Sequence, residues 1–174
     1  MKSLKFFILT MFIMFLFISK VSAQQVGKIT ALQGKVDILK GGKPPAVAAK
    51  VNEVVYLNDI VRTKTDSKAE ITLNDGTVIK IAPRSRVDIS EYFSDAESFK
   101  VSVNLQRGKI GAFVVKESVE KIKISPKTNK FEIKTPIVVA GVRGTNYIVS
   151  HYPTFSKIVV ITGRVYCYNS RIQK

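Results

Sequence analysis

Alternation of apolar and polar residues runs through most of the chain and predicts β-strands. From residue 26 onward, β-branched and aromatic residues alternate with polar ones, and turn-forming residues recur roughly every ten positions. The predicted strands are 26–32, 35–40, 54–62, 68–73, 77–82, 86–92, 99–105, 109–116, 121–125, 130–135, 145–151, 157–162 and 164–168. We expect an all-β domain built as a solenoid-like, layered sheet. A β-sandwich is the alternative, since it satisfies the same alternation.

One hairpin can be aligned from the sequence alone. A three-residue loop from Asn74 to Gly76 places Ile71 opposite Ile79, whereas a two-residue loop would place Ile71 opposite Lys80. The longer loop keeps apolar and charged residues on separate faces. Gly76 also suits the left-handed position at the end of such a loop.

Three glycines follow a common local pattern, which predicts strands that bend at glycine. Gly34, Gly108 and Gly163 each end one strand and are followed by a basic residue and then a β-branched one. Their spacing is irregular, so they do not mark a fixed-period repeat. The face argument used for the first hairpin also predicts Lys123 opposite Glu132 in a second one.

The N-terminal segment has the pattern of a secretory signal peptide. Lys2 and Lys5 precede the apolar residues 6–18, and small residues lead to a predicted cleavage between Ala23 and Gln24. An uncleaved membrane anchor is the alternative, although a spanning helix needs about 20 apolar residues. Cleavage predicts a periplasmic or secreted protein whose mature chain has no transmembrane span.

Composition and charge narrow the chemistry of the remaining domain, residues 24–174. The chain has a net charge of +15, and the first 23 residues carry three lysines and no acid, which leaves +12. One Cys and one His exclude a disulfide framework and sites that need several of either ligand, so no metal or cofactor is expected. The charge either serves solubility alone or attracts anionic lipid or glycan surfaces. Nucleic acid is not an expected partner of an exported domain.

Motifs spread over most of the chain resemble the FecR-type domain family. The stretches that carry the resemblance are 26–36 (VGKITALQGKV), 57–63 (LNDIVRT), 69–83 (AEITLNDGTVIKIAP), 85–89, 105–110, 131–149 (FEIKTPIVVAGVRGTNYIV) and 159–165 (VVITGRV). The resemblance implies an all-β domain outside the cytoplasm, and the best-known members relay an outer-membrane signal to a sigma factor. Those members carry a cytoplasmic segment, whereas this chain resembles stand-alone exported members. It also has Asn58 where the family often has Gly.

The most specific part of the resemblance is a candidate binding or structural motif. Its members extend from the end of one predicted strand to the start of another: Thr135, Pro136, Arg143, Gly144 and Thr145. The guanidinium of Arg143 either recognises a carboxylate or phosphate group or pairs with a turn carboxylate, Asp59 or Asp75. Both acids are expected to act as turn residues.

The last predicted strand carries a candidate surface stripe. Arg164, Tyr166 and Tyr168 alternate, so they share one face, while Val165 and Cys167 are expected to point to the core. The stripe is either an ordinary solvated sheet face or a surface for sugars, bases or a partner strand.

No catalytic set is evident from the sequence. His151 is expected at an exposed turn, and Glu91 and Glu97 are the only loosely placed carboxylate candidates for glycan chemistry. We therefore expect a non-catalytic envelope domain that binds a protein or glycan partner. The alternative is a component of a cell-surface signalling system, regulating a sigma factor through a separate transmembrane partner.

Overall fold

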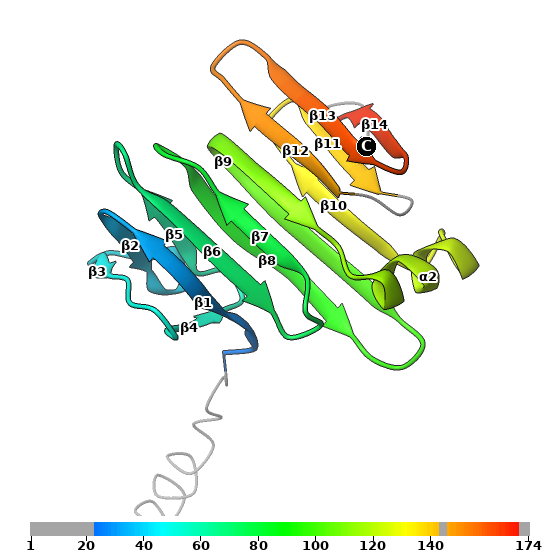
Figure 1. Ribbon diagram of the computed structural model, residues 1–174, viewed down its shortest axis with the longest axis horizontal. Helices are drawn as coiled ribbons and strands as arrows, with labels where there is room; N and C mark the ends of the chain where they lie inside the picture. The colour runs from blue at the N-terminus through cyan, green and yellow to red at the C-terminus, as the bar shows by residue number, and fades with distance from the viewer. Residues whose placement is uncertain (1–22, 143–145, 171–174) are drawn as a thin grey trace, which may run out of the picture.

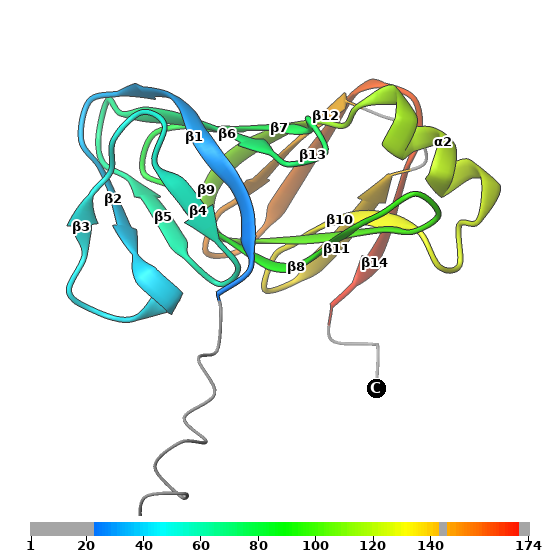
Figure 2. The ribbon, with the colours of Figure 1, turned by 90° about the horizontal axis from the view of Figure 1, so that it is seen from below.

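The computed structural model describes residues 23–142 and 146–170, and strands make up most of this part (Figure 1). Within it the strands join into one 14-stranded sheet. This sheet curls over on itself into two layers, which are seen edge-on in Figure 2. The prediction of an all-β, layered fold is confirmed, and the core lies between the two layers as in a sandwich. The predicted signal segment, apart from Ala23, lies outside the described residues.

The two layers, here called layer A and layer B, share one long strand. In spatial order, layer A contains β4 (Val54–Tyr56), β1 (Gln25–Gln33), β6 (Lys68–Leu73), β7 (Val78–Ile81), the C-terminal half of β9 (Phe99–Phe113), β12 (Asn146–His151) and β13 (Ser156–Thr162). Layer B contains β3 (Val47–Ala48), β2 (Val36–Leu39), β5 (Ile60–Thr63), β8 (Arg86–Ser94), the N-terminal half of β9, β10 (Lys130–Lys134), β11 (Val138–Val142) and β14 (Val165–Asn169). A short 3-10 turn, η1 (Lys40–Gly42), follows β2.

The three glycines predicted to bend strands lie where the chain changes layer. Gly34 separates β1 from β2, Gly108 lies inside β9, and Gly163 separates β13 from β14. Their φ angles are +75°, +97° and +85°, in the left-handed region that favours glycine. At Gly108 a Cβ atom would also overlap Ser85 of the neighbouring strand connection. The predicted bending is confirmed, and β9 is one bent strand rather than two.

The predicted hairpin register is confirmed. Strands β6 and β7 pair Ile71 with Ile79 and Glu70 with Lys80, and Gly76 has a φ of +88°. The predicted strand 54–62 is divided into β4 and β5 by a turn. Asn58 lies in that turn with a φ of +65°, a conformation that Asn tolerates better than most residues.

The prediction of a strand at residues 121–125 is wrong, because helix α2 (Lys116–Ile124) occupies this segment. Strand β10 pairs with β9 in parallel, and a parallel pair needs a crossover connection, usually a helix. Val119 and Ile122 bury one side of the helix. Consequently Lys123 does not face Glu132, which lies opposite Gly141 of β11. Strand β11 was not among the predicted strands.

The core is made by inward-facing residues of both layers, which are buried together in one cluster. At its centre the ring of Phe131 lies 6.5 Å from that of Phe99 and 6.5 Å, edge to face, from that of Tyr147. The Tyr147 hydroxyl donates to the Ala140 carbonyl oxygen (3.2 Å). This hydrogen bond joins β12 of layer A to β11 of layer B across a fully buried interior.

Candidate binding site

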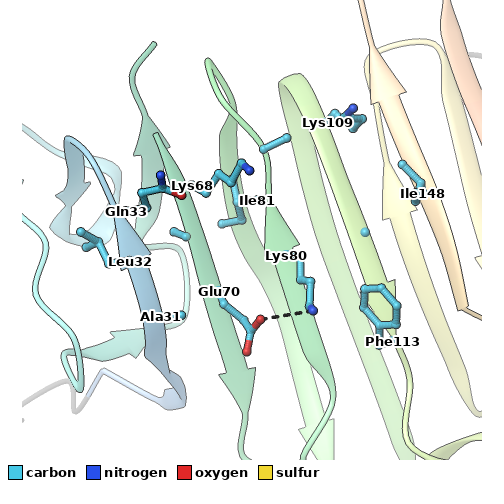
Figure 3. A pocket seen from close by; sticks show the side chains of 13 residues that line it. Ala31, Leu32, Gln33, Lys68, Glu70, Lys80, Ile81, Lys109, Phe113 and Ile148 are labelled. Carbon is cyan, nitrogen blue, oxygen red and sulfur yellow. Dashed lines mark ion pairs between the residues drawn. The ribbon is translucent and has the colours of Figure 1, made fainter. Parts of the chain in front are cut away.

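A groove of about 430 Å³ lies on the outer face of layer A, away from the core (Figure 3). The groove exists because Gly111, which has no side chain, occupies one position in a row of residues that lie opposite one another on neighbouring strands. Ile148 of β12 lies opposite Gly111 of β9, which lies opposite Lys80 of β7. The ring of Phe113, two residues along β9, borders the gap, since a Cβ on Gly111 would lie 3.3 Å from its Cε2 atom.

Lysines surround the apolar part of this groove. Lys68, Lys80 and Lys109 line it from β6, β7 and β9, against a single acid, Glu70. The Nζ atom of Lys80 lies 3.6 Å from Glu70 Oε2 and 5.2 Å from the centre of the Phe113 ring. An exposed ion pair of this kind contributes little stability. The groove therefore offers apolar surface together with exposed positive charge, which suits a ligand that has both apolar and anionic parts.

The groove was not predicted from the sequence. Alternation identifies Lys80, Gly111 and Ile148 as outward-facing, but it does not show that their strands are neighbours. The strand order β6–β7–β9–β12 joins segments far apart along the chain. The only available signal was Gly111 inside a strand, which often marks a place where another group approaches the backbone closely.

Tyr166 and Tyr168, two members of the stripe predicted on the last strand, both bond to a buried carboxylate. Glu132, which is 4 % exposed, accepts hydrogen bonds at Oε1 from the hydroxyls of Tyr166 (3.1 Å) and Tyr168 (3.0 Å). The Tyr166 ring lies over Gly141, where any Cβ would overlap it. Burial and the Glu132 charge raise the pKa of Tyr168 to about 12. Arg164, the third member, is exposed and directly precedes β14 (Val165–Asn169).

The pocket beside this cluster measures about 280 Å³ and is lined by Glu132, both tyrosines, Lys127 and Lys130. Lys130 Nζ lies 3.3 Å from Glu132 Oε2, so the buried charge is compensated. The prediction for the opposite face is only half right. Val165 packs partly against the core. Cys167 is exposed because β14 is the last strand of layer B and, among the described strands, pairs with β11 alone.

The Thr135-Pro136 step forms the turn between β10 and β11. Thr135 Oγ1 accepts from the Val138 amide (3.0 Å) and lies 3.0 Å from Ser156 Oγ of β13. The Pro136 carbonyl oxygen accepts a hydrogen bond from Ser170 Oγ (2.9 Å). The motif thus ties a turn of layer B to layer A. The predicted roles of Arg143, Gly144 and Thr145 fall on residues outside the described ranges.

The prediction that His151 lies at an exposed turn is wrong. His151 is 7 % exposed, and its Nδ1 atom lies 3.0 Å from Ser156 Oγ. Since Ser156 also contacts Thr135, the three side chains form one hydrogen-bonded chain. Burial lowers the pKa of His151. The imidazole therefore helps to hold the two layers together rather than facing solvent.

The carboxylates of the two turn aspartates accept hydrogen bonds from residues that pack around their turns. Asp59, 2 % exposed, accepts from the amides of Gly41 (2.7 Å) and Tyr56 (3.1 Å). In the 74–76 loop, Asp75 Oδ2 accepts from the hydroxyls of Thr77 (2.6 Å) and Ser118 (3.0 Å). The side-chain amide of Asn74 donates to the Gln25 carbonyl oxygen (3.0 Å).

The two carboxylates considered for catalysis lie in different settings. Glu91, on β8, accepts from Ser102 Oγ (3.0 Å). Glu97 lies in the loop between β8 and β9, and its carbonyl oxygen accepts from Asn129 (3.2 Å). Within the described ranges, no three His, Cys, Asp or Glu side chains converge as metal ligands would.

The fold and the site define an all-β domain with a lysine-rimmed groove on one outer face. The chain belongs to the FecR protein family, whose model matches residues 59–166, more than half of the sequence. The predicted family is therefore confirmed. No curated protein matches the chain.

Among solved structures, the chain is similar to a "putative anti-sigma factor" from Parabacteroides distasonis. The identity is 14 %, the TM-score is 0.40, and the alignment covers 63 % of this chain and 59 % of the other. The chain thus matches less than two thirds of that protein, and a likeness of this extent says nothing about function here. In the part of the chain that the structure describes, there is no helix with the length and apolar character to span a membrane.

Proposed function

We propose that this chain is a non-catalytic, exported domain of the cell envelope that binds a protein or glycan partner through the groove on layer A. The observation that carries the proposal is the combination of Gly111, Phe113 and Ile148 with three lysines on one sheet face. Buried apolar surface supplies affinity, and exposed charge supplies attraction and orientation. The partner we expect is an anionic glycan or an acidic protein segment.

The position of the predicted cleavage site, between Ala23 and Gln24, supports export. Ala23 is exposed and directly precedes the domain. The next residue, Gln24, is already part of the fold, because its carbonyl oxygen accepts from the Leu57 amide (2.8 Å) and its side chain donates to the Tyr92 carbonyl oxygen (2.9 Å). Cleavage after Ala23 would remove residues 1–23 without disturbing a described contact of the domain. The location we propose is the periplasm or the exterior.

The alternative, a regulatory component of a cell-surface signalling system, is favoured by membership of the FecR protein family. In that case the partner is a separate transmembrane protein. The two candidates differ in what the domain captures. A signalling component retains one membrane protein, whereas a glycan-binding domain retains polysaccharide.

The groove is tested by two sets of substitutions that change the net charge equally. In the first set Lys68, Lys80 and Lys109 are replaced by Gln, which removes the lysines of the groove. The readouts are capture of partners from envelope extracts at low and high salt, and binding to a sulfated polysaccharide as a defined anionic probe. We expect the substitutions to abolish capture, because at about 0.1 M salt exposed charges act over only about 10 Å, and the lysines that line the groove are then the ones that attract its ligand.

The control set replaces three exposed lysines that do not line the groove, Lys43, Lys50 and Lys123. We expect it to retain most of the binding. Equal loss in both sets would mean that net charge alone binds the probe, and no loss in either set would exclude the groove. A steric variant, Gly111→Val, fills the groove while leaving every lysine in place and should also abolish capture.

A further inference from the structure

A further cavity, here called the bend pocket, measures about 540 Å³ and lies where β9 passes from layer B to layer A at Gly108. Strand β7 and its connection to β8 lie on one side of this part of β9, and β12 lies on the other. Residues of all three segments line the pocket, among them Pro83, Arg84, Arg107, Lys109, His151 and Tyr152. Its volume lies within the range of about 300–1,000 Å³ that is typical of pockets for small organic ligands.

The charged residues that line the bend pocket are all basic. Arg84, Arg107 and Lys109 are exposed, and none of the three forms an ion pair or a side-chain hydrogen bond within the described part of the chain. Burial lowers the pKa of His151, so its imidazole is neutral at pH 7 and adds no charge. The pocket therefore offers an anion three cationic hydrogen-bond donors, and no carboxylate lines it.

Neighbouring residues of layer B add to this positive charge. Arg107 lies opposite Arg86 of β8, and Arg86 lies opposite Arg62 of β5. Like charges directly opposite each other destabilise a sheet, and of these three arginines only Arg62 has a carboxylate partner, Asp37, among the described residues. The Nε atom of Arg86 is buried there without a hydrogen-bond partner. An anion bound nearby would reduce the cost of this arrangement.

The backbone of Arg84 has a conformation that its side chain does not favour. Its φ is +56°, in the left-handed region that is uncommon for residues other than Gly, Asn and Asp. Strained conformations of this kind cluster at binding sites. Because Asn would suit the turn better, the turn itself does not account for an arginine, whereas a ligand held by the guanidinium group does.

We propose that the bend pocket binds an organic phosphate, whose phosphate group is held by Arg84, Arg107 and Lys109. Two guanidinium groups and an ammonium group match the charge and the several acceptor oxygens of a phosphate monoester. The organic part packs against the Tyr152 ring and Pro83. This inference does not rest on the proposed function, because Arg84 and Arg107 do not line the groove. Lys109 lines both sites and is left unchanged in the test.

The test uses the purified protein without a histidine tag. The chain has a single histidine, so the ring resonance of His151 in NMR spectra reports on the pocket without ambiguity. The ligands are glucose 6-phosphate, inorganic phosphate and, as the uncharged control, glucose. We expect the resonance to move with both phosphates, at lower concentrations of glucose 6-phosphate because its sugar also contacts the apolar walls. Glucose alone should leave the resonance unchanged.

The two arginines are tested by substitution. Arg84→Asn and Arg107→Gln should each weaken binding of glucose 6-phosphate roughly tenfold, because each removes a charge-assisted hydrogen-bond donor. Arg84→Asn should retain or raise the stability of the fold, since Asn suits a positive φ, and this separates loss of binding from loss of structure. The control for the two substitutions together is Lys43→Gln with Lys50→Gln, which removes two exposed charges outside both sites. It should change the affinity by less than about twofold.

Three outcomes would overturn the proposal. The first is a His151 resonance that does not move at millimolar glucose 6-phosphate. The second is equal weakening by the arginine pair and the lysine pair, since net charge alone would then explain binding. The third is an equal affinity for glucose 6-phosphate and inorganic phosphate, which would leave no role for the apolar walls.

A last comparison keeps this pocket distinct from the groove. Gly111→Val, which fills the groove, should leave binding of glucose 6-phosphate intact, so either proposal can fail without the other. Sedimentation with vesicles that contain phosphatidic acid distinguishes a lipid phosphate from a soluble one. Vesicle binding that glucose 6-phosphate displaces would assign the site to a lipid headgroup, and binding of glucose 6-phosphate without vesicle binding would assign it to a soluble phosphate ester. Both results agree with the proposal.

Discussion

The cluster of Glu132, Tyr166 and Tyr168 allows a quantitative prediction for a buried carboxylate on a sheet surface. The Glu132 side chain is 5 % exposed, and its Oε1 atom accepts both tyrosine hydroxyls. A hydrogen bond to a charged group contributes about 1.5–3 kcal/mol. Both tyrosines are half-buried, so their hydroxyls can turn to water when the carboxylate is removed. We therefore use the lower end of this range for each bond.

On this basis Glu132→Ala should lower the free energy of unfolding by about 3 kcal/mol, and Tyr168→Phe by about 1.5 kcal/mol. A double-mutant cycle of Glu132→Gln with Tyr168→Phe should give a coupling energy of about 1 kcal/mol. The assay is urea unfolding followed by circular dichroism. Tyr152→Phe is the control, because the Tyr152 ring is 45 % exposed, and it should change stability by less than about 0.5 kcal/mol.

Two outcomes would refute this reasoning. Equal effects of Tyr168→Phe and Tyr152→Phe would mean that the hydroxyl bond to Glu132 contributes nothing. An increase in stability with Glu132→Ala would mean that the cost of burying the carboxylate exceeds all its interactions, including the ion pairs with Lys130 (3.3 Å) and Lys134 (3.9 Å).

Three further predictions concern residues whose surroundings the structure defines. Burial lowers the pKa of His151 below its ordinary value of 6.5, so the unfolded chain binds the proton more tightly than the folded one. The free energy of unfolding should therefore be highest above pH 6.5 and fall as the pH drops through the folded-state pKa. His151→Asn should flatten this pH dependence, as measured by urea unfolding. Gly141→Ala should destabilise by about 2 kcal/mol because the new Cβ overlaps the Tyr166 ring, and Tyr166→Ala should relieve that cost; a neutral Gly141→Ala would contradict the packing. Cys167 is exposed, and burial of part of its surface raises the pKa of its thiol. A maleimide reagent should therefore label it in the folded protein, more slowly than free cysteine at the same pH, and absence of labelling before unfolding would show that β14 is covered.

Local patterns predicted most of the strands and the turns that join neighbours. The β6–β7 register followed from face separation alone, since Ile71 and Ile79 had to share a side. The bends at glycine were predicted because one strand pattern ends, and the next begins, at a single glycine residue. These features depend on contacts between residues close in sequence, and for that reason a single sequence contains them.

Features that depend on distant segments were missed or misread. The α2 segment has apolar residues that fit either period, and the parallel pairing of β10 with β9 decides in favour of a helix. His151 was expected in solvent because the sequence does not show that it lies opposite Gly108 of β9, which is distant along the chain. Cys167 was expected in the core because the sequence does not show that β14 is an edge strand. The groove depends on the strand order of layer A.

The strand shared by the two layers has a consequence for the order in which the chain acquires its structure. Strand β9 hydrogen-bonds to β8 and β10 in layer B and to β7 and β12 in layer A. During synthesis, which starts at the N-terminus, β1 to β8 are made before β9. The edges of β7 and β8 that pair with residues 99–113 therefore stay unpaired until β9 is present. Only when this strand arrives do both edges close together. We therefore expect the two layers to fold together, and truncation before residue 99 to leave two unprotected edges rather than a smaller domain.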